Sequence, residues 1–421
     1  MVLTIMIDIL AQFVFYYPLV MAMVWITGAM LFFIRYERSG YKHPSIPPQL
    51  PYYPGVSILV PCFNEAKNIY ETLYWLDKID YPEYEVIAIN DGSCDETAEI
   101  LVELTKKFDK LRVVDLATNQ GKAMALRMGA LTAKYEYLVG IDGDAILDTN
   151  ALTWMMHHMV TDPNCGAVTG MPLVRTRSTL LGKIQVGEFS AIIGLIKRTQ
   201  KILGFLFTVS GAVSAFRKSA LHEVGYWNLN MITEDIDITW RLQVANWSVY
   251  FEPNAMCWIL CPETLRGLWK QRIRWAQGGA EAALAHTKTI LLKHKFHLWL
   301  MLIDYFISVL WAYAVVVVLG GYLFEWTNTP QSSYDIKQWL PGIQGTLLGT
   351  VCLFQFAVSL FFNKRFEVGK GGHLYWIIWY PIVFWLISLL TILIAVPKAI
   401  FKRKEERALW SSPDRGIDSE N

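Results

Sequence analysis

The sequence has few charged residues for its length. Lysine, arginine, aspartate and glutamate make up 18% of the 421 residues, whereas about one quarter is usual in soluble domains. Hydrophobic residues reach 53%, and 17 residues are tryptophan. This composition predicts that part of the chain is embedded in a membrane.

The sequence also lacks an excess of charge of either sign, because its formal net charge is only +1. Proteins that bind nucleic acids usually carry a basic stripe, and we find none, so no nucleic-acid partner is expected. The six cysteines are dispersed, and only Cys257 and Cys261 lie close together. Without a second pair they do not complete a zinc site, and we expect reduced, buried thiols in a cytosolic domain.

Two common nucleotide-binding motifs are absent. No Gly-x-Gly-x-x-Gly follows the first predicted strand, which argues against a dinucleotide cofactor. Gly121 and Lys122 open a predicted helix, but they lack the upstream glycine and the following hydroxyl of a phosphate-binding loop. Any nucleotide must therefore be bound in another way.

Long apolar segments do occur, at both ends of the chain. Residues 10–34 are long enough to cross a bilayer, which needs roughly 20 apolar residues. This segment has neither a basic start nor a small-residue cleavage site, so we interpret it as an anchor and not as a signal peptide. Residues 298–324, 343–362 and 374–396 have a similar length. The sequence thus predicts about four membrane spans.

The positive-inside rule places the central domain in the cytoplasm, because Arg35, Arg38 and Lys42 follow the first span. With four spans, however, the basic tail at 402–407 would lie outside, against the same rule. Either one apolar segment does not cross the membrane or the count of spans is wrong by one.

Between the spans, apolar runs alternate with helical patterns. Strands are expected at 56–60, 86–89, 112–116 and 137–141, and helices at 66–78, 96–108 and 122–133. This alternation predicts an α/β domain with a mostly parallel sheet and helices on both faces. The predicted domains are an anchor (1–38), a proline-rich linker (39–54), the α/β domain (55–260), amphipathic interfacial helices (261–297), a transmembrane bundle (298–401) and a polar tail (402–421).

Three of the predicted strands end in polar residues: Pro61-Cys-Phe-Asn-Glu65, Asn90-Asp-Gly-Ser93 and Asp142-Gly-Asp144. Ligands bind beyond the carboxyl ends of strands in such sheets. Carboxylates that share one edge repel one another unless a cation lies among them. An acidic edge with a divalent cation suits a nucleotide diphosphate, whose phosphates reach the protein through the metal.

Three motifs resemble those of the family 2 glycosyltransferases. They are Asp142-Gly-Asp144, Thr233-Glu-Asp235 and Gln271-Arg-Ile-Arg-Trp275, the last being typical of the processive, polymer-making branch. The resemblance implies a glycosyltransferase-A (GT-A) fold. It also implies an inverting transferase in the bacterial inner membrane, with several spans and a cytoplasmic catalytic domain.

The resemblance also implies roles for individual residues. Asp144, with Asp142, would hold Mg²⁺ or Mn²⁺; Asp235 would act as general base, supported by Glu234. The nucleotide-sugar would contact Pro61, Asn64, Glu65, Asp91, Lys122 and Asp142, and the diphosphate and acceptor would contact Gln271, Arg272, Arg274 and Trp275. Structural explanations also exist: the acidic motifs can be strand-end turns or helix caps, and 268–275 also suits an amphipathic interfacial helix.

Longer stretches, such as Gly267-Leu-Trp-Lys-Gln-Arg272, resemble a subgroup that makes bacterial biofilm polysaccharide. This closer resemblance implies UDP-N-acetylglucosamine as donor, a growing β-1,6-linked polysaccharide as product and membrane lipid as surroundings. Some members need a small membrane subunit and respond to cyclic-di-GMP, but no motif here locates either site. The alternatives are a hyaluronan-, chitin- or cellulose-like synthase, or a transporter with an inactive sugar-binding domain.

Overall fold

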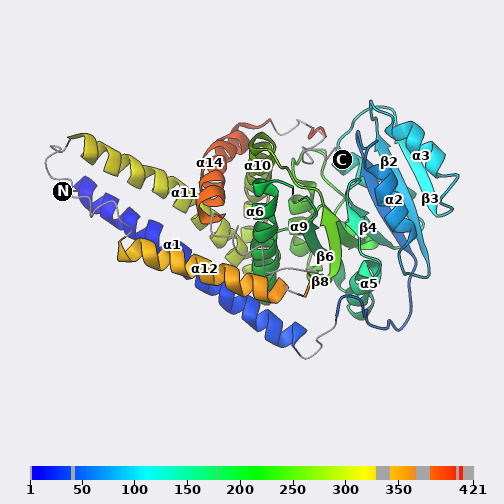
Figure 1. The fold of residues 1–421 in the computed structure, drawn as a ribbon, viewed down its shortest axis with the longest axis horizontal. Coiled ribbons are helices and arrows are strands. Elements are labelled where there is room, and N and C mark those ends of the chain that lie inside the picture. Colours follow the sequence, from blue (N-terminus) through cyan, green and yellow to red (C-terminus); the bar gives the residue numbers. More distant parts are fainter. Residues whose placement is uncertain are drawn as a thin grey trace.

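The computed structural model describes residues 2–38, 43–176, 178–328, 342–363, 365–366, 380–403 and 407–410. It consists of an α/β domain beside a group of long helices (Figure 1). Three predicted features lie partly outside the described residues: the proline-rich linker, the apolar segment at 374–396 and the end of the tail.

The first half of the sheet is parallel and matches the prediction. Strands β1 (Val56–Cys62), β2 (Tyr84–Asp91), β3 (Leu111–Leu116) and β4 (Tyr137–Ile141) lie in the order β3-β2-β1-β4. Every residue of β1, β2 and β4 is buried, because parallel strands are covered on both faces.

Helices cover both faces of these strands. Ile58 and Val60 of β1 belong to the hydrophobic core on one face, and Leu59 belongs to the core on the other, since successive side chains of a strand point to opposite sides. The first core contains residues of α2 (Ile69–Asp77), α3 (Thr97–Leu104) and α5 (Ala151–Thr161), and the second contains residues of α4 (Lys122–Thr132), α8 (Lys218–Glu223) and α9 (Glu234–Val244).

The second half of the sheet makes it mixed. Strand β7 (Val213–Arg217) pairs antiparallel with both β4 and β6 (Cys165–Val174). Strand β8 (Ser248–Ile259) is parallel to β6, and β5 (Ile146–Leu147) closes the edge antiparallel to β8. The sheet is therefore parallel where the sequence alternates strand and helix, and mixed beyond β4.

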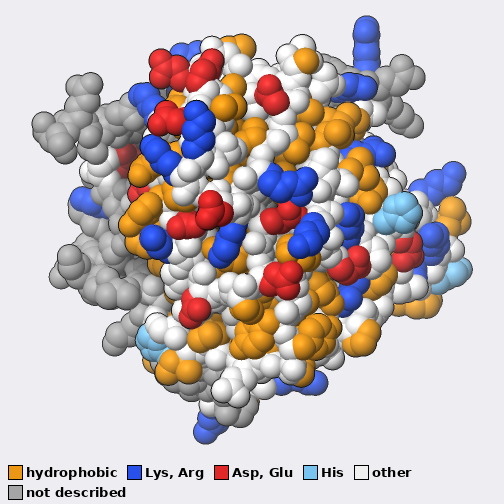
Figure 2. Space-filling view, turned by 90° about the vertical axis from the view of Figure 1, so that its right-hand side faces the viewer, with side chains coloured by type: hydrophobic (Ala, Val, Ile, Leu, Met, Phe, Trp, Pro, Cys, Tyr) orange, Lys and Arg blue, Asp and Glu red, His pale blue; other side chains and the backbone are white. Residues whose placement is uncertain are grey.

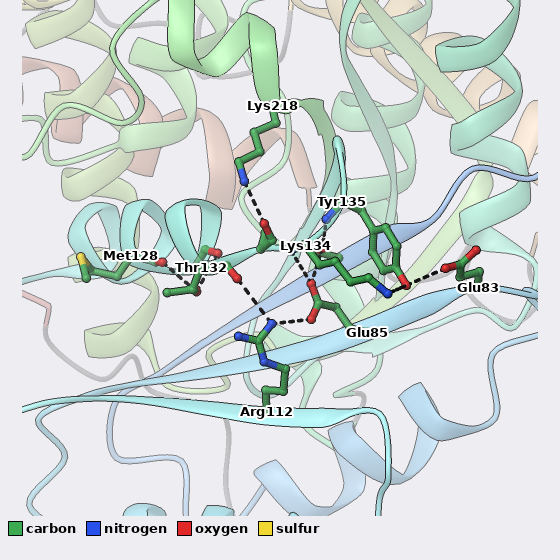
Figure 3. Close-up of polar contacts among 11 residues, drawn as sticks. Glu83, Glu85, Arg112, Met128, Thr132, Lys134, Tyr135 and Lys218 are labelled. Atoms are coloured by element: carbon green, nitrogen blue, oxygen red, sulfur yellow. Dashed lines mark hydrogen bonds and ion pairs between the residues drawn. The ribbon is translucent and has the colours of Figure 1, made fainter.

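A buried glutamate fastens the amino-terminal end of the sheet, opposite the acidic edge (Figure 3). Glu85 on β2 accepts hydrogen bonds from Ser57 Oγ at 2.7 Å and from the Lys134 backbone N–H at 2.7 Å, and Arg112 pairs with it at 2.6 Å. Burial alone would raise the pKa of Glu85, but these donors lower it below its usual value. The ionised carboxylate thus joins β1, β2 and β3.

The charged side chains of the α/β domain are mixed on its surface. At the end of the molecule that carries β3 and α3, lysine and arginine alternate with aspartate and glutamate (Figure 2). This distribution agrees with the nearly neutral net charge of the sequence.

Three helices are long and apolar enough to cross a membrane within the described residues, at Ile5–Glu37, Phe296–Phe324 and Gly345–Asn363. The first comprises α1 (Val2–Phe32) and the π-helix η1 (Phe33–Glu37), and the others lie in α11 (Phe296–Asn328) and α12 (Ile343–Asn363). Both α11 and α12 contact α1. One continuous helical stretch, formed by α6 (Leu180–Glu188), η2 (Phe189–Ile196) and α7 (Lys197–Ile202), also packs against α1.

The last helix, α14 (Tyr380–Phe401), corresponds to the fourth predicted span but packs along α10 (Leu265–Leu292). After it, Lys402 Nζ pairs with Glu281 Oε2 of α10 at 2.9 Å, and the Ala408 N–H donates to the Leu229 carbonyl at 3.0 Å. The beginning of the tail therefore lies against α10 and the α/β domain. If the three candidate spans of the described residues are the crossings, the domain and the beginning of the tail would lie on one side of the membrane, as the basic residues of both favour.

Candidate active site

The carboxyl ends of β1, β2 and β4 meet at one edge, as predicted. At the end of β2, Asp91 is fully buried and accepts from the Gln120 N–H and the Gly121 N–H, each at 2.8 Å. Burial raises the pKa of Asp91, and the two backbone donors oppose that rise. Both carboxylate oxygens of Asp91 therefore bind the backbone of the loop before α4. Gly121 suits that loop because its φ of +92° favours glycine.

Residues after β1 connect this edge to the loop after β2. Asn64, at a φ of +57°, accepts a hydrogen bond from the Cys94 N–H at 2.9 Å, and its own N–H donates to Ser93 Oγ. Glu65 is 2% exposed, and its N–H donates to Thr97 Oγ1 at 2.8 Å. Pro61 is a buried residue of β1, and its carbonyl lies beside Gly143 of the acidic turn. The structure thus places Pro61, Asn64 and Glu65 together, beside the acidic turn at Gly143 and the loop after β2.

Lys122 is the centre of the charged cluster. It begins α4, and its Nζ lies 2.5 Å from Asp142 Oδ1 and 3.4 Å from Glu234 Oε1. Although burial favours the neutral amine, the nearby carboxylates raise the pKa of Lys122. The ammonium therefore joins the Asp-x-Asp turn to the first turn of α9.

Asp144 has the chemistry of a cation ligand. Burial, with a further contribution from Asp142, raises its pKa to about 7. Within the described residues no group of three or more His, Cys, Asp and Glu side chains could hold a metal. Asp142 and Asp144 offer two carboxylates, the kind of ligand that suits a divalent metal such as Mg²⁺, which also takes substrate phosphates as ligands.

The three acids of α9 have different surroundings. Asp235 is partly buried and accepts from the Gly211 N–H at 3.2 Å and from the Ile236 N–H at 2.9 Å. Burial and the neighbouring Glu234 raise the pKa of Asp235 to about 6. Asp237 is fully buried and pairs with Arg241 Nε and His286 Nε2, both at 2.8 Å. Asp235 can thus exchange a proton near neutral pH, whereas Asp237 fastens α9 to α10.

Helix α10 presents its motif residues in two directions. Arg274 is exposed and lines a cavity of about 360 Å³ together with Lys122 and Glu234. Arg272 is buried, pairs with Glu188 of α6 at 2.7 Å and lies 4.3 Å from the centre of the Trp275 ring. The structure therefore brings Arg274 into the charged cluster and turns Arg272 toward α6.

The other two motif residues lie on the α6 side. Trp275 packs edge-on against Phe189, with ring centres 6.2 Å apart. The Gln271 side chain has its Oε1 atom buried without a hydrogen-bond partner among the described residues. Neither residue lines the cavity that contains Lys122, Glu234 and Arg274.

Residues of the tail complete this cavity, and the sequence analysis did not assign them to the site. Lys402, Arg407 and Trp410 line it. Arg407 donates to Gln120 Oε1 at 2.8 Å, and the Trp410 carbonyl accepts from Asn119 Nδ2 at 2.8 Å. The conflict between the basic tail and the four-span count was the sequence signal that could have placed it here.

Comparison with known proteins identifies the family. Residues 54–278 match the family model described as "Glycosyltransferase like family 2". Poly-β-1,6-N-acetyl-D-glucosamine synthase from Staphylococcus epidermidis is 39% identical over 406 residues, which are 96% of this chain and 98% of the relative. The synthase of the same name from Staphylococcus aureus (strain COL) is 40% identical over 409 residues, with the same two shares.

A solved structure shows the same fold. The mannosyltransferase PcManGT from Pyrobaculum calidifontis, in complex with GDP-Man and Mn²⁺, aligns over 92% of this chain and 99% of its own, with a TM-score of 0.58 and 17% identity. This likeness confirms the predicted GT-A fold. Since the family model covers more than half of the sequence and the two synthases match nearly all of it, the chain belongs to the family 2 glycosyltransferases.

Proposed function

We propose that the chain is a processive, inverting synthase that polymerises N-acetylglucosamine from UDP-N-acetylglucosamine into a β-1,6-linked polysaccharide and helps to move it across the membrane. The observation that carries this proposal is the identity of 39–40% to synthases of that name over 96% of the chain. The charged cluster around Lys122 and Asp235 supplies a chemical basis for it.

In the proposed reaction, Asp235 accepts the proton of the acceptor 6-hydroxyl as that oxygen attacks C1 of the donor sugar. The bond from C1 to the diphosphate breaks, UDP leaves, and the configuration at C1 inverts. A carboxylate whose pKa is about 6 is ionised at neutral pH and is a stronger base than an ordinary aspartate. Glu234 contributes by holding Lys122 beside the base.

On the donor side, Lys122 and Arg274 provide positive charge for the diphosphate. Both line the cavity, together with Lys402 and Arg407 of the tail. Asp144 and Asp142 would hold Mg²⁺ or Mn²⁺, which neutralises charge on the leaving diphosphate. We assign Pro61, Asn64, Glu65 and Asp91 to the uridine end of the donor, mainly as residues that shape its loops.

On the acceptor side, we assign Trp275 to stacking on the sugar, with Gln271 beside it and Arg272 holding the indole. Helix α10 leads to α11, which holds the second candidate span and packs against α10. Arg35 and Arg38 support a cytoplasmic catalytic domain in a multi-pass inner-membrane protein, because basic residues flank the inner ends of spans. An accessory subunit and control by cyclic-di-GMP remain part of the proposal through the resemblance to the subgroup.

The test is to incubate membranes that contain the chain with labelled UDP-N-acetylglucosamine and Mg²⁺ or Mn²⁺. We expect a polymer whose linkage analysis gives β-1,6 bonds, and no polymer from the Asp235→Asn variant. A different linkage would assign the chain to another synthase type. Donor binding without transfer, with all required subunits present, would instead support a non-catalytic sugar-binding protein.

A further inference from the structure

One buried lysine lies close to the candidate base but outside the cavity. Lys197 begins α7 and is 6% exposed. Its ammonium donates to Thr169 Oγ1 at 3.1 Å and lies 5.9 Å from the centre of the Phe251 ring. Among the described residues it has no carboxylate within ion-pair distance. Burying a charge beside a single neutral hydroxyl is unfavourable, so the position calls for an explanation.

The Thr169 hydroxyl connects this lysine to the loop that holds Asp235. Besides Lys197, Thr169 Oγ1 accepts from the Ser210 N–H at 2.8 Å. The next N–H in the chain, that of Gly211, donates to Asp235 Oδ2, and the Gly211 carbonyl accepts from Lys122 Nζ at 3.2 Å. Two hydrogen bonds to Thr169 Oγ1, the Ser210–Gly211 backbone and one hydrogen bond from Gly211 therefore link Lys197 to the carboxylate.

Lys197 also contributes charge behind the base. Burial lowers the pKa of Lys197 to about 7, and Asp235 acts in the opposite direction. The other charged groups that face Asp235 are Glu234 on its own helix, Lys122 on α4 and Arg274 on α10. In the pH range where Asp235 takes up its proton, Lys197 is still protonated, so that it favours the ionised carboxylate.

We propose that Lys197 is a positioning residue for sugar transfer: through Thr169 it fixes the Ser210–Gly211 backbone that orients Asp235, and its charge favours the carboxylate. This inference rests on the proposed function of Asp235 as the base. Lys197 is called a positioning residue and not a catalytic one, because it does not line the cavity and acts through Thr169.

The experiment compares variants of the full chain in membranes, with initial rates measured from pH 5 to 8. Lys197→Met is expected to lower kcat by about tenfold, which corresponds to roughly 1.4 kcal/mol of barrier. It should move the acid limb of the kcat profile to higher pH and leave the donor KM within about twofold of wild type. Thr169→Val should lower kcat without moving the acid limb, since the charge remains, whereas Thr169→Ser should keep wild-type kcat.

Lys201→Met is the matched control. Lys201 lies one turn further along α7, is partly buried and donates to the Val249 carbonyl, and burial lowers its pKa to about 8. Its removal should change neither kcat nor the acid limb. The proposal is overturned if Lys197→Met behaves as wild type or if Lys201→Met reproduces its effects.

The remaining results separate a failure of the Lys197 proposal from a failure of Asp235 as the proposed base. If Lys197→Met does not fold, the Thr169 pair tests the hydroxyl link by itself, and equal rates of Thr169→Val and Thr169→Ser would refute that link. An active Asp235→Asn variant would refute the proposed base. Loss of activity in Asp235→Asn with an unchanged Lys197→Met would refute only the role of Lys197.

Discussion

At the residue scale, the acids in the first turn of α9 show how similar side chains acquire different roles. All three benefit from the positive end of the helix dipole. Glu234 pairs with Lys122 and Asp237 pairs with Arg241 and His286, whereas Asp235 accepts hydrogen bonds from two backbone N–H groups of the described residues. Only the last arrangement leaves a carboxylate that can take up a proton without breaking an ion pair.

We therefore expect Asp235→Asn and Asp237→Asn to differ in kind. Removal of a general base typically costs on the order of 100-fold or more in kcat, so Asp235→Asn should lose turnover and retain its fold. Asp237→Asn weakens the ion pairs of a fully buried carboxylate with partly buried partners and should lower the free energy of unfolding by about 3 kcal/mol. Its kcat per folded molecule should stay close to wild type. Rates normalised to folded protein separate the two, and equal losses of kcat would contradict this division.

The pH dependence of kcat follows from the same carboxylate. The pKa of Asp235 is raised to about 6, so that the ionised base is present above this pH and is lost as pH falls through it. Turnover should be nearly constant from pH 7 to 8 and fall about tenfold per unit below pH 6. Initial rates at saturating donor measure this. An acid limb near pH 4, the usual aspartate value, would show that the base is not held in a desolvated site.

At the scale of elements, the start of the tail closes the cavity from a position almost 300 residues away in sequence. The Ala408 carbonyl lies against Gly121, where any added Cβ would be 2.2 Å away. Arg407 binds Gln120, whose N–H in turn donates to Asp91. The tail thus supports the loop before α4 and contributes positive charge to the cavity.

Ending the chain after Arg403 should consequently weaken donor binding. We expect the KM for the donor to rise by about tenfold, the equivalent of one lost charge-assisted hydrogen bond. The kcat should change less, because Asp235 and Lys122 remain in place. Arg407→Ala in the full-length chain is the matched variant and should give part of the effect. A truncated protein with an unchanged donor KM would show that the tail only rests on the domain.

At the scale of the whole molecule, buried charges join the membrane helices to the catalytic domain. Glu37, at the end of the first candidate span, accepts from Arg198 of α7 and pairs with Arg365, which follows α12, at 2.7 Å. Arg198 is fully buried and also bonds to Asn363 at 3.1 Å. Since breaking such a network is costly, the spans and the domain should move together.

Labelling of single cysteines tests the arrangement across the membrane. Among the described residues Cys94 is the exposed native cysteine, and Leu409 and Ile343 are exposed positions in the tail and at the start of α12. The wild-type chain first shows from which side native Cys94 reacts with a membrane-impermeant thiol reagent. In a Cys94→Ser background, Leu409→Cys should react from that same side. Ile343→Cys should react only from the opposite side. Reaction of Leu409→Cys from the opposite side would restore the count of four spans.

Much of this protein follows from local sequence patterns. Alternating apolar runs predicted the four parallel strands and the helices between them, because burial on two faces requires continuous apolar strands. The motifs at strand ends predicted one acidic edge, since parallel strands deliver their carboxyl ends to the same side. Apolar length predicted four spans, because a helix must cover the bilayer core, and three of them correspond to candidate spans within the described residues.

Only the tertiary structure decided which side chain meets which. The spacing along α10 does not reveal that Arg272 pairs with Glu188 while Arg274 lines the cavity that contains Lys122. The tail sequence does not reveal its contact with Gly121. The position of Lys197 in the sequence does not reveal its link to Asp235 through Thr169. Helix periodicity and hydrophobicity are properties of neighbouring residues, whereas these contacts join segments far apart in the chain. The sequence by itself thus determined the parallel half of the sheet and the acidic edge, whereas long-range packing determined the mixed half of the sheet, the place of the tail and the individual contacts at the site.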